Sequence, residues 1–183
     1  MVKITINENV SKIKENSGWD IKKDWIVWIP GGVVGLNVAC KTALAPGELV
    51  MIPSPIYAPF TEAPENMERG FVKTNLKDVN GRLELDFDSV RSLLTDDTKM
   101  FSFCNPHNPG GSVFRKNELE NIIDFCEKNN MFICSDEIHA GMVLGAHKHI
   151  PIASISEIAA NRTITLMSLS KTFNFPGAGL GWM

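Results

Sequence analysis

The stretch KMFSFCNPHNPGG, residues 99–111, joins a nearly continuous apolar run to an abrupt polar turn. A short run that is apolar at almost every position is typical of a strand buried on both faces of a sheet. The same arrangement recurs in MFICSDEIH (131–139) and RTITLMSLSKTFN (162–174). These stretches predict buried strands whose ends carry polar, chemically useful residues.

Further β-rich runs occupy residues 25–29, 48–52 and 70–74. Helical patterns lie between the strands, over residues 33–45, 87–95 and 117–129, and Asp86 or Asp88 is suited to cap the second of these helices. Alternation of strands and helices predicts parallel strands joined by crossovers, and hence an α/β sheet.

The composition is that of one globular domain covering residues 1–183, with 44% hydrophobic and 21% charged residues. The net charge of −3 and the lack of a basic run argue against a nucleic-acid partner. The first residues, MVKITINENVSK (1–12), do not contain the apolar stretch typical of a signal peptide, and no apolar run approaches the ~20 residues of a membrane span. We therefore expect a cytoplasmic protein without a membrane partner.

The four cysteines form no C-x-x-C pair, and Cys104 and Cys134 lie within apolar strand-like runs. This pattern predicts buried free thiols in a reducing compartment.

Ligands of open α/β sheets bind beyond the carboxyl ends of the strands. After the run at 25–29 comes PGGVVGLN (30–37), a glycine turn that enters a helix and offers backbone N–H groups to an anion such as phosphate. An Asp at a strand end can neutralise a cationic ring nitrogen, and a Lys in a partly dry cleft has a lowered pKa and is nucleophilic. Together these groups are the parts needed to hold pyridoxal 5'-phosphate (PLP).

Taken singly, each signal also has a structural interpretation. The glycine turn fits simple helix entry, Asp136 fits a helix cap or surface acid, Lys171 fits a solvated lysine, and NPHNP fits a rigid turn. The PLP hypothesis depends on their joint occurrence on successive strand ends.

These motifs resemble fold-type I PLP-dependent enzymes of the aminotransferase class I/II superfamily, and among them the bacterial C–S lyases, or cystathionine β-lyase-like proteins. The resemblance is carried by PSPIYAPF (53–60), CNPHNPGG (104–111), SDEIHAGMVLGAHKHIPIASIS (135–156) and SKTFN (170–174). It implies a mostly parallel seven-stranded sheet with helices on both faces, in which GLGWM (179–183) begins a last, antiparallel strand.

The resemblance also implies residue roles. Lys171 matches the catalytic lysine that binds the cofactor covalently and moves the proton at the substrate Cα. Asp136 matches the acid that keeps the pyridine nitrogen protonated, and Asn108 matches the donor to the cofactor's phenolic oxygen. His139 stands where many aminotransferases carry a Tyr with a similar task. Tyr57 matches the aromatic residue that stacks on the ring, although packing at a strand end is an alternative for it.

The resemblance also implies that two further segments bind the phosphate group of the cofactor. Gly32, Val33 and Val34 match the backbone turn that cups the phosphate. Ser168 matches a phosphate-binding hydroxyl, and Ser170 assists it.

Two positions depart from the pattern. Gly179 stands where many relatives carry a phosphate-binding Arg. The lyase subgroup often lacks this Arg as well. Gly110 stands where Thr, Ser or Val is usual, which predicts a looser loop.

The resemblance further implies that the chain is the large, cofactor-binding domain of a longer homodimeric enzyme, truncated at both ends. The N-terminal segment and the C-terminal small domain would then be absent. Because the small domain carries the Arg that grips the substrate α-carboxylate, we expect no turnover from this chain alone.

The resulting hypothesis is a PLP-dependent C–S β-lyase acting on cystathionine-like or cysteine-like amino acids. An aminotransferase using the same cofactor site, or a non-catalytic truncated domain, is the alternative.

Two other hypotheses fit less well. A dinucleotide-binding module is suggested by GAGLG (177–181), but the G-x-G-x-x-G pattern would require Gly where Trp182 stands. A zinc site built from His139, His147 and His149 lacks a Cys or acid at typical spacing, so we expect no metal.

Overall fold

The computed structural model describes residues 6–175 and 179–183. Its strands are β1 (Trp28–Ile29), β2 (Leu49–Ser54), β3 (Gly70–Val79), β4 (Arg82–Leu85), β5 (Thr98–Cys104), β6 (Phe132–Asp136), β7 (Thr163–Ser168) and β8 (Gly181–Trp182). Its helices are α1 (Ile6–Ser17), α2 (Gly32–Ala43), α3 (Pro59–Asn66), α4 (Phe87–Ser92), α5 (Lys116–Lys128) and α6 (Glu157–Arg162), with short 3-10 turns η1 (Lys23–Trp25), η2 (Ala140–Met142) and η3 (Ile152–Ser154).

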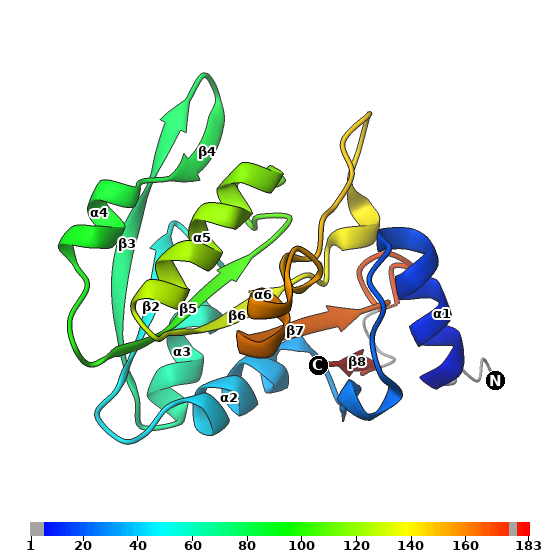
Figure 1. Ribbon diagram of the computed structural model, residues 1–183, viewed down its shortest axis with the longest axis horizontal. Helices are drawn as coiled ribbons and strands as arrows, with labels where there is room; N and C mark the ends of the chain where they lie inside the picture. The colour runs from blue at the N-terminus through cyan, green and yellow to red at the C-terminus, as the bar shows by residue number, and fades with distance from the viewer. Residues whose placement is uncertain (1–5, 176–178) are drawn as a thin grey trace.

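The strands form one sheet in the order β1-β8-β7-β6-β5-β2-β3-β4 (Figure 1). The five central strands, from β7 to β3, are parallel to one another. β8 is antiparallel to β7, as expected for GLGWM, and β1 is antiparallel to β8. β1 therefore runs in the same direction as the central strands, and its carboxyl end lies at the same edge of the sheet.

The expectation of seven strands is wrong, because the described residues form eight. The additional strand, β4, pairs antiparallel with β3. Asn80 and Gly81 connect the two strands with positive φ angles of 56° and 79°, and the Gly81 amide donates to Asp78 Oδ1 at 2.7 Å. An Asn-Gly pair is a strong hairpin signal because both residues tolerate positive φ. The sequence therefore contains a local signal for the β3–β4 hairpin.

Side chains of the central strands alternate between two hydrophobic cores. Val50 and Ile52 pack on the side of α2 and α3, whereas Met51 packs on the side of α4, α5 and α6. In Figure 1 the sheet forms a central layer with helices on both sides. The prediction of an α/β sheet buried on both faces is confirmed.

The predicted helices are present with small shifts of their ends, at α2, α4 and α5. Asp86 is the residue that caps α4, and its Oδ1 accepts hydrogen bonds from the Asp88 and Ser89 amides. The helices α1, α3 and α6 were not predicted. α3 and α6 are short, with eight and six residues, and α3 contains Pro64.

All four cysteines are buried and free, as predicted. Within residues 6–175 and 179–183, no helix combines the length and apolar character that a membrane crossing requires.

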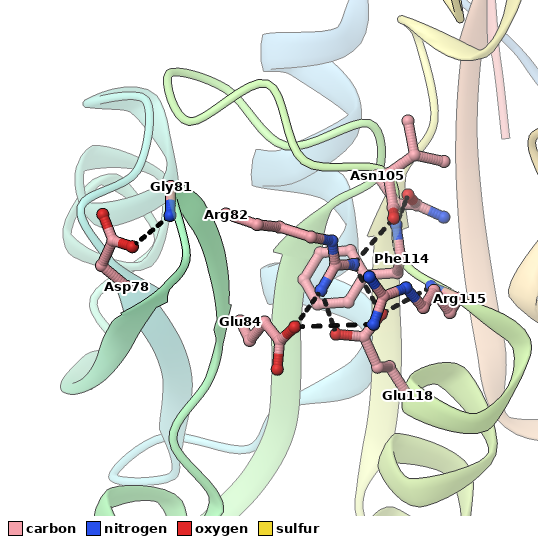
Figure 2. Close-up of polar contacts among 9 residues, drawn as sticks. Asp78, Gly81, Arg82, Glu84, Asn105, Phe114, Arg115 and Glu118 are labelled. Atoms are coloured by element: carbon pink, nitrogen blue, oxygen red, sulfur yellow. Dashed lines mark hydrogen bonds and ion pairs between the residues drawn. The ribbon is translucent and has the colours of Figure 1, made fainter. Parts of the chain in front are cut away.

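The loop after β5 is held at its far end by an ion-pair cluster (Figure 2). Arg82 on β4 donates to both carboxylate oxygens of Glu118, at 2.7 and 2.6 Å, and to the Val113 carbonyl at 2.9 Å. Glu84 accepts a further bond from Arg82 at 2.8 Å. A bidentate Arg–carboxylate contact has a defined geometry, so the cluster fixes the start of α5 against the β3–β4 hairpin.

Candidate cofactor site

The polar strand ends predicted from the sequence lie at one edge of the sheet. Asp136 ends β6, Ser168 ends β7, and the turn that opens α2 follows β1. Because these strands run in one direction, the topology places their carboxyl ends at the same edge. The structure thus brings together segments more than a hundred residues apart.

Asp136 is only 3% exposed. Burial raises the pKa of its carboxyl to about 7, and the nearby charge of Glu137 also raises it. The Ile138 amide, which donates to Asp136 Oδ1 at 3.1 Å, and the Lys171 ammonium both act in the opposite direction on this pKa. A buried carboxyl with a strongly perturbed pKa is characteristic of functional sites.

Lys171 lies in the turn that follows β7, and its side chain is exposed. Its charge lowers the pKa of Asp136 and of His139, so Lys171 lies within electrostatic reach of both. Burial is the larger cause of the lowered His139 pKa, and together the two effects favour a neutral imidazole.

Asn108 and Tyr57 are neighbours, because the Tyr57 amide donates to the Asn108 carbonyl at 3.2 Å. Tyr57 is 45% exposed, which disfavours the alternative of a packed strand-end residue. The loop bearing Asn108 is tied to β6 by Asn105, whose amide donates to the Asp136 carbonyl at 2.9 Å. Asn105 is fully buried, and its Oδ1 accepts from the Phe114 amide at 3.0 Å (Figure 2). The sequence analysis did not identify this linking role.

The start of α2 lies against the segment after Asp136, because a Cβ on Gly32 would come within 3.5 Å of the Ile138 side chain. No side chain among the described residues caps this helix, and Val33 and Val34 are exposed. Uncapped N–H groups at a helix N-terminus form a favourable site for an anion.

Ser168 and Ser170 are hydrogen-bonded to one another through their hydroxyls. The Ser168 hydroxyl also donates to the Leu180 carbonyl at 2.6 Å and accepts from the Ser170 amide at 3.1 Å. In this arrangement Ser168 connects the end of β7 to the segment before β8.

Gly110 does not loosen its loop, contrary to expectation. A Cβ at this position would lie 2.6 Å from Leu83 Cδ1 and 2.7 Å from His107 Nδ1. The Gly110 amide also donates to His107 Nδ1 at 3.2 Å. Gly110 is therefore needed for close packing.

Gly179 has φ +55° and lies beside the Pro30 carbonyl. An Arg at this position would be strained in the left-handed backbone conformation, which provides a local reason for its replacement.

The two weaker hypotheses gain no support. His149 is engaged by Glu137, and within the described ranges no group of three or more potential ligands is placed to hold a metal. Gly177 and Ala178 of GAGLG lie outside the described residues, and Gly181 belongs to a strand.

A hollow of about 560 Å³ adjoins the site. It is lined by the loop from Pro106 to Val113, by His139 and by Met142. Asp136 and Lys171 are not among its lining residues, so it lies beside the predicted cofactor position.

The α/β fold, with its mostly parallel sheet, matches the fold of fold-type I PLP-dependent enzymes. The sequence matches the family "Aminotransferase class I and II" over residues 6–183, and the chain belongs to this family.

Known proteins of this type resemble the chain in sequence and structure. Cystathionine beta-lyase PatB of Bacillus subtilis is 32% identical over 166 residues, which cover 90% of this chain and 43% of the relative. The crystal structure of OvoB is 37% identical, with a TM-score of 0.94 over 100% of this chain and 49% of that chain. The crystal structure of cystalysin from Treponema denticola, which contains PLP, is 34% identical with a TM-score of 0.93, over 99% of this chain and 47% of that chain.

Aminotransferases also occur among the curated relatives. The chain spans less than half the length of the curated relatives it matches. The comparisons support PLP as the cofactor of this family and leave the substrate open.

Proposed function

We propose that this chain is the cofactor-binding domain of a PLP-dependent C–S β-lyase that acts on cystathionine-like or cysteine-like amino acids. The observation that carries the cofactor site is the buried carboxyl of Asp136. Burial raises its pKa to about 7, although the charge of nearby Lys171 acts in the opposite direction. The complete enzyme would be a homodimer with a further, small domain.

The residues fit PLP in charge and donor type. The uncapped start of α2, with Gly32, Val33 and Val34, supplies backbone N–H groups for the phosphate, and Ser168 and Ser170 supply hydroxyls. A buried anionic Asp136 would be compensated by a protonated ring nitrogen, which removes the cost of its isolated charge.

The remaining residues would orient the cofactor ring and carry out the chemistry at the substrate Cα. Asn108 would donate to the phenolic oxygen, with His139 beside it, and Tyr57 would cover the ring face. The bound cofactor supplies a sink for the electron pair that develops at the substrate Cα. Lys171 would hold the cofactor covalently and, once released, its neutral amine would remove the Cα proton.

A lyase would release a thiol from Cβ of the substrate, whereas an aminotransferase would exchange the substrate's amino group with a keto acid. The lyase is favoured by the names of PatB and of a PLP-bound C–S lyase from Staphylococcus hominis, a solved structure 30% identical to this chain. An aminotransferase is the second candidate because relatives such as a probable aspartate/prephenate aminotransferase are also 30% identical.

The test uses the complete enzyme that contains this sequence. We expect pyruvate and thiol to be released from cystathionine without an added keto acid. Amino exchange that requires a keto acid, without pyruvate release, would instead favour the aminotransferase.

A further inference from the structure

His107 lies within the loop that carries Asn108 and has no role in the proposed chemistry. It is only 3% exposed. Its amide donates to the Ser112 carbonyl at 2.8 Å, and its carbonyl accepts from the Gly111 amide at 2.7 Å. Its ring Nδ1 accepts from the Gly110 amide at 3.2 Å. His107 therefore closes this turn through both its backbone and its side chain.

The sequence of the loop explains why a side chain takes part in closing the turn. Pro106 and Pro109 have no backbone N–H group, so fewer backbone hydrogen bonds are available to hold the loop. The next residue, Gly110, directs its amide to the His107 ring. A Cβ on Gly110 would lie 2.7 Å from Nδ1, so the ring approaches this closely because the position is a glycine.

The bond from Gly110 also fixes which ring nitrogen carries the proton. Because Nδ1 accepts, a neutral His107 ring has its proton on Nε2. Burial lowers the pKa of His107, which favours the neutral ring, and the Pro55 carbonyl acts in the opposite direction as a hydrogen-bond acceptor. Since Nδ1 faces Gly110, Nε2 is the nitrogen left to face Pro55. This second contact is loose, because Nε2 is buried and has no partner at ordinary hydrogen-bond geometry among the described residues.

The two segments that meet at the His107 ring both carry predicted cofactor contacts. Asn108 directly follows His107, and Tyr57 lies two residues after Pro55. The Tyr57 amide donates to the Asn108 carbonyl at 3.2 Å. The imidazole and this backbone bond thus link the same two segments.

We propose that His107, as the neutral tautomer with its proton on Nε2, is a positioning residue that holds the Asn108 loop closed against the segment bearing Tyr57. The inference rests on the proposed function, in which Asn108 donates to the phenolic oxygen and Tyr57 covers the ring face. His107 acts on the cofactor only through these two residues.

The first measurement needs no substitution and therefore does not depend on a variant folding. Long-range ¹H–¹⁵N NMR of the His107 ring, in this chain without cofactor at pH 7, should show an unprotonated Nδ1 and a protonated Nε2. A proton on Nδ1, in the other tautomer or in an imidazolium, would overturn the proposal.

Two variants separate the Nδ1 bond from simple packing. His107→Phe keeps a buried ring without an acceptor, whereas His107→Asn is smaller but places an amide oxygen near the Nδ1 position. Hydrogen exchange of the Gly110 and Tyr57 amides should be about fivefold faster in His107→Phe, the equivalent of one hydrogen bond, and closer to the original rate in His107→Asn.

A residue that only fills space would give the reverse order, because Asn leaves the larger cavity. Exchange that is equally fast or faster in His107→Asn would therefore overturn the proposal. Ser112→Ala is the matched control, because it removes a buried hydroxyl of the same loop that has no partner among the described residues. We expect unchanged exchange at Gly110 and Tyr57 in this control.

The complete enzyme that contains this sequence, loaded with PLP, links the loop to the cofactor. The absorption band of the bound cofactor responds to the groups at its phenolic oxygen. The band should shift in His107→Phe in the same direction as in Asn108→Ala, and less in His107→Asn. A band that moves in Asn108→Ala but not in His107→Phe would contradict the positioning role. If Asn108→Ala leaves the band unchanged, the proposed role of Asn108 fails, while the tautomer and exchange measurements still decide that of His107.

Discussion

The amide of Asn105 donates a hydrogen bond of 2.9 Å to the carbonyl of Asp136. This bond joins the end of β6 to the first residue of the loop that carries Asn108, the predicted donor to the cofactor. The acid that would pair with the ring nitrogen and the amide that would donate to the phenolic oxygen are thus linked to each other through the backbone. Such preorganisation reduces the entropy lost when a ligand binds.

Lys171→Ala should abolish covalent attachment of PLP. With PLP and borohydride, the unsubstituted chain is expected to carry the reduced adduct on the peptide containing Lys171, because the charge of Lys171 lowers the pKa of both Asp136 and His139. Peptide mapping by mass spectrometry makes the measurement. Lys116→Ala, on the exposed start of α5, is the control, and labelling of a different lysine would contradict the assignment.

Asp136 should make the stability of the cofactor-free chain fall with rising pH. Since its folded pKa is about 7, above the ordinary value, the folded state retains a proton that the unfolded chain releases from about pH 4 upward. The free energy of unfolding should therefore decrease between about pH 4 and pH 7, by at most about 4 kcal/mol, and then level off.

Asp136→Asn should remove this dependence and raise the free energy of unfolding at pH 7 relative to the unsubstituted chain. Urea denaturation at pH 5 and pH 8 is the measurement, and Asp124→Asn, on the exposed face of α5, is the control. A stability difference between the two pH values that survives in Asp136→Asn would show that another group is responsible.

Gly110→Ala should destabilise the chain by about 1–3 kcal/mol, because the added methyl group has no room beside Leu83 and His107. Denaturation of the single variant and of a Leu83→Ala, Gly110→Ala pair tests the cause. The cost of the Gly110 substitution should be smaller in the Leu83→Ala background, and an equal cost would mean that contact with Leu83 is unimportant.

Arg82→Met should cost about 2–4 kcal/mol of stability, because it leaves the largely buried Glu118 carboxylate without its main partner. Arg91→Met is the matched control, since its pair with Asp88 is exposed and should contribute less than about 1 kcal/mol. Equal losses in the two variants would show that the cluster in Figure 2 has no special role.

Much of the site could be predicted from local patterns. Asp136, Ser168 and the turn before α2 each follow an apolar run, and strand ends of one direction converge at one edge of a sheet. The family role of each residue came from resemblance, because an Asp or Lys at a strand end is by itself compatible with several functions.

The sequence by itself determined which segments become buried strands and which polar residues end them, because a strand covered on both faces must be apolar at nearly every position. Tertiary structure alone decided which distant groups meet. His149 pairs with Glu137 twelve residues away rather than joining His139 and His147, and Arg82 reaches Glu118 across thirty-six residues. The physical reason is that the packing of the sheet and its loops decides which distant side chains come into contact. The residues next to a charged side chain in the sequence therefore do not specify its partner.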